Sequence, residues 1–131
     1  MHKGYLRITA LLGALSVTLG AFAAHYLKSI LIEKDVQIFE TGVRYQMYHS
    51  LALGLVAILY KEFPNKFMKW AGLFFILGIT LFSGSLYLFT YKNANHLQGL
   101  QWVGPITPLG GILFIAGWLC FALGIKHKYE K

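Results

Sequence analysis

One polar stretch interrupts an otherwise apolar part of the chain, ETGVRYQMYHS at residues 40–50, which carries Arg44, Gln46 and His49. A guanidinium binds carboxylates and phosphates through its planar fork of N–H donors, and an amide both donates and accepts hydrogen bonds. Glu40 precedes Arg44 by four residues, the spacing that pairs opposite charges on a helix. The stretch therefore predicts either a site for an anionic group or a purely structural pair of Glu40 and Arg44.

Other apolar segments of the chain contribute polar side chains that suit the same site. They supply hydroxyl and imidazole groups, which bind oxyanions and other polar groups through hydrogen bonds. Together with Arg44, Gln46 and His49, the predicted ligand-binding group contains His25, Ser83, Ser85, Tyr87 and Thr107.

The histidines and serines of this group lack the patterns that metal binding and catalysis require. His25, His49 and His96 supply imidazoles, but their separations match no local zinc-ligand pattern. Ser83 and Ser85 lack a nucleophile-elbow motif, and no carboxylate lies within an apolar segment to orient a histidine as a base. We therefore expect a protein that is not an enzyme, with no metal, no cofactor and no catalytic residue.

The composition places these residues in a membrane protein. Hydrophobic residues make up 56% of the 131 residues and charged residues only 13%, whereas soluble domains carry about 25% charged residues. The formal net charge is +7, but lysines and arginines cluster between apolar segments rather than forming a basic stripe. The sequence therefore predicts membrane lipids as partners and no nucleic acid.

Four apolar segments are long enough for membrane-spanning helices: residues 5–27, 42–60, 70–91 and 108–125. Each is continuous rather than alternating, which favours helices over a β-barrel. We predict an all-α, integral membrane four-helix bundle that forms a single domain over residues 1–131.

Local signals set the predicted boundaries. Pro64 separates the second and third segments, and Thr107 followed by Pro108 is typical of a capped helix start. The mixed connection at residues 28–40 is expected to lie along the membrane interface. The sequence Ala21-Phe22-Ala23 resembles a signal-peptidase site, but the apolar run continues beyond it, so we expect an uncleaved first helix.

The basic residues predict the orientation of the bundle. With both termini in the cytoplasm, eight basic residues lie inside and four outside, as the positive-inside rule requires. This N-in/C-in arrangement in the plasma (inner) membrane places the predicted ligand-binding group toward the outer leaflet. The inner residues are Lys3, Arg7, Lys61, Lys66, Lys69, Lys126, Lys128 and Lys131, and the outer ones Lys28, Lys34, Arg44 and Lys92.

Small residues recur at helical spacing in the first and last segments. Gly13 and Gly20 belong to the first, and Gly110, Gly117 and Gly124 to the last. Such stripes let helix backbones approach closely in lipid. We therefore expect the first and last helices to be close partners, within one molecule or across an oligomer.

Four motifs in order resemble the small membrane proteins of domain-of-unknown-function family 423: GAFAAH at 20–25, ETGVRYQMYH at 40–49, FSGSLY at 82–87 and GPITPLGG at 104–111. The family includes bacterial UPF-type inner-membrane proteins and the eukaryotic transmembrane protein 256. The resemblance extends over about residues 13–117. It implies a multi-pass plasma-membrane protein with no established activity, and it supplies no catalytic residue.

Three functions fit these observations. The first is binding of a lipid headgroup or other anionic group at the predicted ligand-binding group. The alternative is a non-catalytic scaffold or accessory subunit, working as a homo-oligomer or with a membrane-protein partner. The third is a small-solute carrier, which requires a water-filled cavity lined by Gln46, His49, Ser83 and Thr107.

Overall fold

The computed structural model describes residues 1–99 and 101–125, and within them the chain forms helices and turns but no strand. The predicted all-α, four-helix fold is therefore confirmed. Two short segments, η1 and η2, are π-helical. The elements are α1 (Lys3–Phe22), η1 (Ala23–Leu27), α2 (Lys28–Ile30), α3 (Glu33–Leu59), α4 (Lys66–Gly78), η2 (Ile79–Ser83), α5 (Gly84–Ala94) and α6 (Val103–Gly124).

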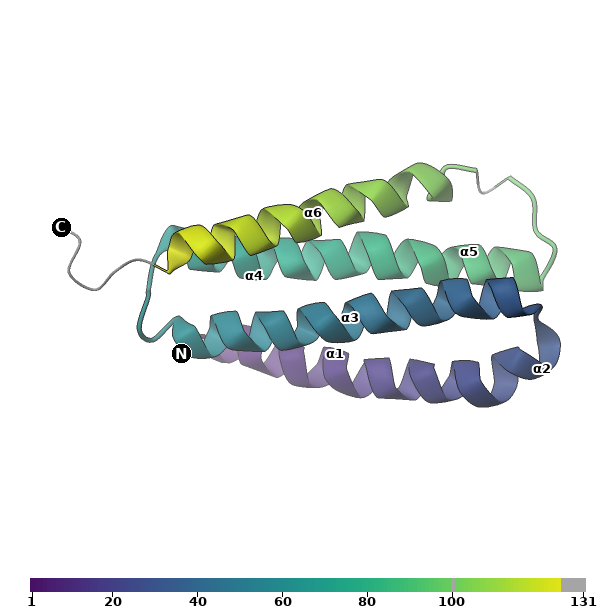
Figure 1. The fold of residues 1–131 in the computed structure, drawn as a ribbon, viewed down its shortest axis with the longest axis horizontal. Coiled ribbons are helices and arrows are strands. Elements are labelled where there is room, and N and C mark those ends of the chain that lie inside the picture. Colours follow the sequence, from purple (N-terminus) through teal and green to yellow (C-terminus); the bar gives the residue numbers. More distant parts are fainter. Residues whose placement is uncertain (100, 126–131) are drawn as a thin grey trace.

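The elements form four antiparallel rods (Figure 1). The first runs through α1, η1 and α2, and the third through α4, η2 and α5. One end of the bundle, here called the N-terminal end, holds the starts of α1 and α4 and the ends of α3 and α6. Lys126, Lys128 and Lys131, used to predict the orientation, lie outside the described residues, and the N-in/C-in orientation stays a prediction.

Three helical segments of the described chain are long and apolar enough to cross a membrane: 3–30, 66–94 and 103–124. The remaining rod, α3, has 27 residues and lies alongside them, but it is not among these candidates. Its central part carries the polar residues on which the predicted site depends.

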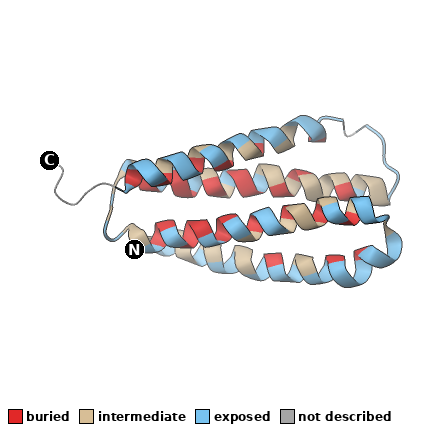
Figure 2. Ribbon diagram, viewed as in Figure 1, coloured by how far each residue is buried: buried red, intermediate tan, exposed pale blue. Residues whose placement is uncertain are grey.

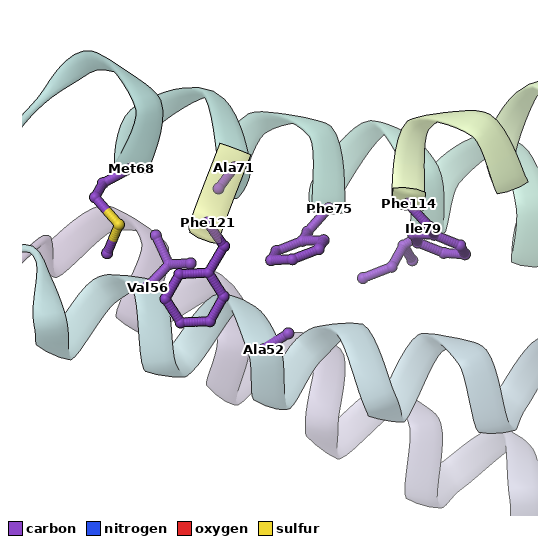
Figure 3. Packing of buried hydrophobic residues seen from close by; sticks show 8 residues of the cluster. All are labelled: Ala52, Val56, Met68, Ala71, Phe75, Ile79, Phe114 and Phe121. Carbon is purple, nitrogen blue, oxygen red and sulfur yellow. The ribbon is translucent and has the colours of Figure 1, made fainter. Parts of the chain in front are cut away.

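α3 and the α4–α5 rod occupy the middle of the bundle, while α1 and α6 flank them on opposite sides (Figure 1). Buried residues concentrate on the facing sides of the two middle rods, whereas α1 is largely exposed (Figure 2). The main core sits toward the N-terminal end, where apolar side chains from α3, α4, η2 and α6 interlock (Figure 3). Its members include Val56, Phe75 and Phe121.

α3 begins at Glu33, so the predicted start at Gly42 is wrong by nine residues. Glu33 and Asp35 lie in its first turn, where acidic groups interact favourably with the helix dipole. Most of the connection that was expected to lie along the interface is therefore helix. Gly42 therefore lies inside α3, and it packs against the Tyr87 ring, where a Cβ atom would come within 2.8 Å of a ring carbon.

α6 begins at Val103, so the prediction that Thr107 caps a helix starting at Pro108 is also wrong. Pro105 falls in the first turn, where its missing N–H has no intrahelical partner to lose. Pro108 lies one turn further in and removes a single hydrogen bond, to the carbonyl of the exposed Gly104. The helix therefore starts five residues before Pro108.

Three glycines of α6 face the third rod. A Cβ atom at Gly117 would lie 2.7 Å from the Phe75 ring, one at Gly124 would lie 2.6 Å from the Met68 sulfur, and one at Gly110 would overlap the backbone of Phe82. α1 packs along α3 instead, so within one molecule the first and last helices are not the close partners that their small residues predicted.

Candidate functional site

Gln46 is the centre of a hydrogen-bond network that joins three rods. Its side chain is only 2% exposed. Nε2 donates to the carbonyl oxygen of Leu12 in α1 at 3.1 Å, and Oε1 accepts from the Tyr87 hydroxyl in α5 at 2.7 Å. Both ends of the amide are thus satisfied inside the protein.

Two serines at the junction of η2 and α5 extend this network. The buried Ser83 hydroxyl donates to the carbonyl oxygen of Gly42 at 2.6 Å, which ties the third rod to α3. The Ser85 hydroxyl is hydrogen-bonded to the Thr107 hydroxyl of α6. We call Gln46, Tyr87, Ser83, Ser85 and Thr107, together with the His49–Trp118 pair described next, the polar network.

His49 is buried and uses both ring nitrogens. Nε2 lies 3.1 Å from Nε1 of Trp118, and Nδ1 lies 2.7 Å from the carbonyl oxygen of Tyr45. Because an indole N–H can only donate, Nε2 must accept, and the proton is on Nδ1. The ring is therefore neutral, and it stacks on Phe114 with 3.6 Å between centroids.

Trp118 is the functional partner that sequence reasoning missed. It lies within the apolar run of α6, and no nearby polar residue marks it. Pairing it with His49 requires knowledge of how α3 and α6 face each other, which the sequence does not provide. Gly42 was overlooked for the same reason, since its carbonyl and its missing side chain matter only against the third rod, through Ser83 of η2 and Tyr87 of α5.

The predicted segment 42–60 placed Gln46 and His49 in the first turns of the second helix, but the structure places them further along it. Gln46 is the midpoint of α3, with thirteen residues on either side. His49 lies one turn further toward the N-terminal end and contacts the second half of α6. The shift follows from the earlier start of α3, and it places these polar groups deep in the bundle rather than at its edge.

Arg44 and His25 lie outside this network. His25 is exposed within η1, and its imidazole forms no hydrogen bond with another residue of the described chain. Arg44 is exposed on α3, and its Nη2 donates to the Thr41 hydroxyl at 3.0 Å. No ion pair joins Arg44 to Glu40 or to another carboxylate in the described ranges, so the Glu40–Arg44 pair stays a prediction.

Arg44 begins a stripe of exposed residues on α3, and the others in the stripe are uncharged. Successive members of the stripe are four, three, four and three residues apart along the chain, which keeps them on one face of the helix. Arg44 itself lies eleven residues, or about 16 Å, from the start of the helix. The other members are Tyr48, Leu51, Leu55 and Ile58.

An apolar groove of about 690 Å³ lies beside this stripe, between α3 and α6. Aromatic rings form much of its wall, and His49 lies at its inner side with both nitrogens engaged. The α3 wall comes from Tyr45, Tyr48 and His49, and the α6 wall includes Pro108, Phe114 and Trp118.

The histidines do not assemble into a metal site in the structure. His49 is buried, whereas His25 and His96 are exposed. Among the residues that the structure describes, no three His, Cys, Asp or Glu side chains gather as metal ligands would.

The sequence comparison decides the family. A model described as "Protein of unknown function (DUF423)" matches residues 19–111. The chain belongs to this family. The resemblance predicted from the four motifs is thereby confirmed, and the protein is a membrane protein of unknown function.

Relatives within DUF423 align over nearly their whole length. The "UPF0382 membrane protein" of Haemophilus influenzae is 42% identical over 95% of this chain and 94% of its own. YwdK of Bacillus subtilis is 40% identical over 89% and 91%, respectively. The "UPF0382 inner membrane protein YgdD" of Escherichia coli is 34% identical over 96% and 92%. No solved structure matches the chain.

The DUF423 match covers most of the polar residues described above. It includes Arg44, Gln46, His49 and the residues of η2 and α5, and it ends at Gly111, before Trp118. The names of these relatives denote a membrane location and no enzymatic activity.

Proposed function

We propose that this protein binds an anionic lipid headgroup through Arg44. The observation that carries the proposal is an exposed arginine well inside a 27-residue helix, with no carboxylate partner among the described residues. A charged residue at the centre of a membrane helix costs about 2.5–3.5 kcal/mol on insertion scales. A phosphate group beside the guanidinium lowers that cost, because the pair forms charge-assisted hydrogen bonds.

The direction of the Arg44 side chain supports the same reading. Its hydrogen bond to Thr41 shows that the guanidinium reaches back along α3 toward the first turn of that helix. This direction leads away from the N-terminal end of the bundle. This is how a long basic side chain brings its charge toward a membrane surface. The remaining N–H donors of the guanidinium are left for a ligand.

The proposed site is narrower than the ligand-binding group predicted from sequence. Gln46, His49, Ser83, Ser85, Tyr87 and Thr107 bond to protein groups, so they have little capacity left for a ligand. Arg44 alone carries the electrostatic part of the proposal.

Lipid retention tests this proposal directly. Wild type and Arg44→Gln would be reconstituted in mixed phosphatidylglycerol and phosphatidylcholine vesicles, extracted in mild detergent and examined by native mass spectrometry. A basic group near an anionic lipid contributes about 1 kcal/mol, so we expect about fivefold less retained phosphatidylglycerol in the variant. Lys28→Gln removes the same charge from an exposed position at the bundle end and should retain lipid as wild type does.

Two results would contradict the proposal. One is equal retention in wild type and Arg44→Gln, and the other is equal loss in Arg44→Gln and Lys28→Gln, which would indicate a general effect of net charge. Circular dichroism of each variant verifies that it remains helical.

The second candidate is a non-catalytic scaffold or accessory subunit, and the polar network favours it. Its side chains join all four rods through hydrogen bonds to one another and to backbone carbonyls, as expected of groups that fix helix positions. On this hypothesis Arg44→Gln changes neither lipid retention nor helix content.

The small-solute carrier is the least favoured of the three functions. Gln46 and Ser83 have almost no solvent-accessible surface, and their polar atoms bond to the protein. They therefore do not line a water-filled pathway in this conformation.

A further inference from the structure

We infer that the groove between α3 and α6 holds one acyl chain of the lipid whose headgroup binds Arg44. The inference rests on the proposed headgroup site at Arg44. It adds a second site, for the acyl chain of the same lipid. The ligand class is a long-chain anionic amphiphile rather than a free phosphate or other soluble anion.

The chemistry of the groove suits a hydrocarbon chain. Its lining is predominantly apolar, and the side chains of Tyr45, Phe82 and Phe114 supply broad ring surfaces. The histidine that contributes to the groove has no free nitrogen, since Nδ1 and Nε2 are both hydrogen-bonded. A polar ligand would gain few partners there and would lose its own hydration.

The length of the groove matches one leaflet of a bilayer. On α6 it extends from Pro108 to Trp118, ten residues or about 15 Å along the axis. The hydrocarbon core of a membrane is about 30 Å thick, so this length is half of it. One acyl chain descending from a headgroup therefore spans the groove from end to end.

Arg44 lies at the correct end for such a lipid. α3 and α6 run in the same direction, with Tyr45 packed near Phe114, and His49 bonded to Trp118. The guanidinium extends toward Thr41 and hence toward the Pro108 end of the groove. A headgroup at Arg44 thus places its chain in line with the groove, and the chain end near Trp118.

Gly111 provides a way to close the groove without disturbing the fold. It lines the groove, and a Cβ atom added there would meet no atom within 4 Å. Gly111→Leu therefore fills groove space rather than core space. Gly104 is the matched control, because it belongs to the same helix, is equally open, and does not line the groove.

The experiment uses fluorescence of Trp118. Trp70 and Trp102, both exposed, are replaced by Phe to leave Trp118 as the single tryptophan. The protein is placed in phosphatidylcholine vesicles that contain a minor fraction of phosphatidylglycerol brominated near the methyl ends of its chains. The reference is the same fraction of identically brominated phosphatidylcholine, and bromine quenches tryptophan only at short range.

We expect brominated phosphatidylglycerol to be enriched about fivefold at Trp118 over brominated phosphatidylcholine, the ratio that one basic residue supplies. Gly111→Leu should abolish this enrichment while phosphatidylglycerol still co-purifies with the protein. Gly104→Leu should behave as the parent protein does, and Arg44→Gln should lose both enrichment and co-purification.

The outcomes separate the two proposals. Enrichment that survives Gly111→Leu overturns the chain site and leaves the headgroup site standing. The chain site is also overturned if the parent protein shows no enrichment of brominated phosphatidylglycerol at Trp118, while Arg44→Gln loses the co-purifying phosphatidylglycerol. The headgroup site again stands. If the groove is filled by a second copy of the chain, Gly111→Leu shifts the mass in detergent from dimer to monomer, and the chain site is again overturned.

Discussion

The two outer helices contact the middle of the bundle in different ways. α6 approaches the third rod through Gly110 and Gly117, which leave no room for side chains. The glycines of α1 make no such contact with α3, because Gly13 meets no atom within 4 Å and Gly20 meets only a Val43 methyl at 3.6 Å. Where these two helices do come close, the glycine belongs to α3, since a Cβ atom at Gly54 would lie 3.1 Å from Thr9.

Hydrogen bonds join α1 to α3 where its glycines make no close contact. The hydrogen bond from Gln46 to the Leu12 carbonyl joins α1 to α3 near the middle of both helices, and the amide N–H of His2 donates to the Ala57 carbonyl at the N-terminal end. The same kind of small-residue stripe therefore acts as a contact surface in α6 and as an open surface in α1. A stripe of small residues allows another helix to approach closely. Whether a helix does so depends on the surface of the neighbouring helix.

The largest effect is expected from Gly110→Leu. Because a side chain here would overlap the backbone of Phe82, α6 must move away from η2, and we expect the free energy of unfolding to fall by about 3 kcal/mol or more. Gly13→Leu is the control and should cause no loss, because the side chain meets open space and leucine is a better helix former than glycine. Denaturant titration in detergent, followed by circular dichroism, measures both. Equal losses would remove the distinction between the two stripes.

An intermediate effect is expected from Gln46→Leu. The substitution leaves the Tyr87 hydroxyl without its acceptor and removes the bond to Leu12, at a cost of about 1–2 kcal/mol. Tyr87→Phe added to this variant should cost little more, because the two side chains share one bond. Gln37→Leu, on the exposed surface of the same helix, is the control. Additive losses in the double variant would show that the network does not act as a unit.

The smallest effect is expected from Gly13→Ala. The added methyl group meets open space, and alanine is a better helix former than glycine by up to about 1 kcal/mol, so stability should rise slightly. Thermal melting in detergent measures the change. A clear loss of stability, accompanied by a lower mass in detergent, would instead show that this face of α1 contacts another molecule.

The sequence predicted the number and order of the helices but not all of their ends. Continuous apolar runs and Pro64 were sufficient for four rods, because lipid selects segments by hydropathy and length. The start of α3 was missed because its first two turns are charged and extend beyond the apolar run, where hydropathy carries no information about helix. The start of α6 was missed because Thr107-Pro108 was a stronger local signal than Pro105.

The residues of the polar network other than Trp118 were predicted, but their hydrogen-bond partners were not. Gln46, His49, Ser83 and Thr107 stand out in an apolar chain by type alone. Which of them bond to each other depends on the rotation of each helix about its axis, and a single sequence does not fix that angle. Arg44 was grouped with them, yet it points to the outside of the bundle because it is two residues, or about 200°, away from Gln46 on the helix.

The composition of α3 has a consequence for how the protein is made. Three helical segments are apolar enough to enter a bilayer alone, and α3, with its polar midpoint, is not among them. Transfer of an amide such as that of Gln46 into hydrocarbon costs little free energy only when neighbouring helices already offer it hydrogen-bond donors and acceptors. We therefore expect the insertion machinery to retain α3 beside α1 until the third rod has emerged from the ribosome, so that α3 enters lipid together with the third rod and not on its own.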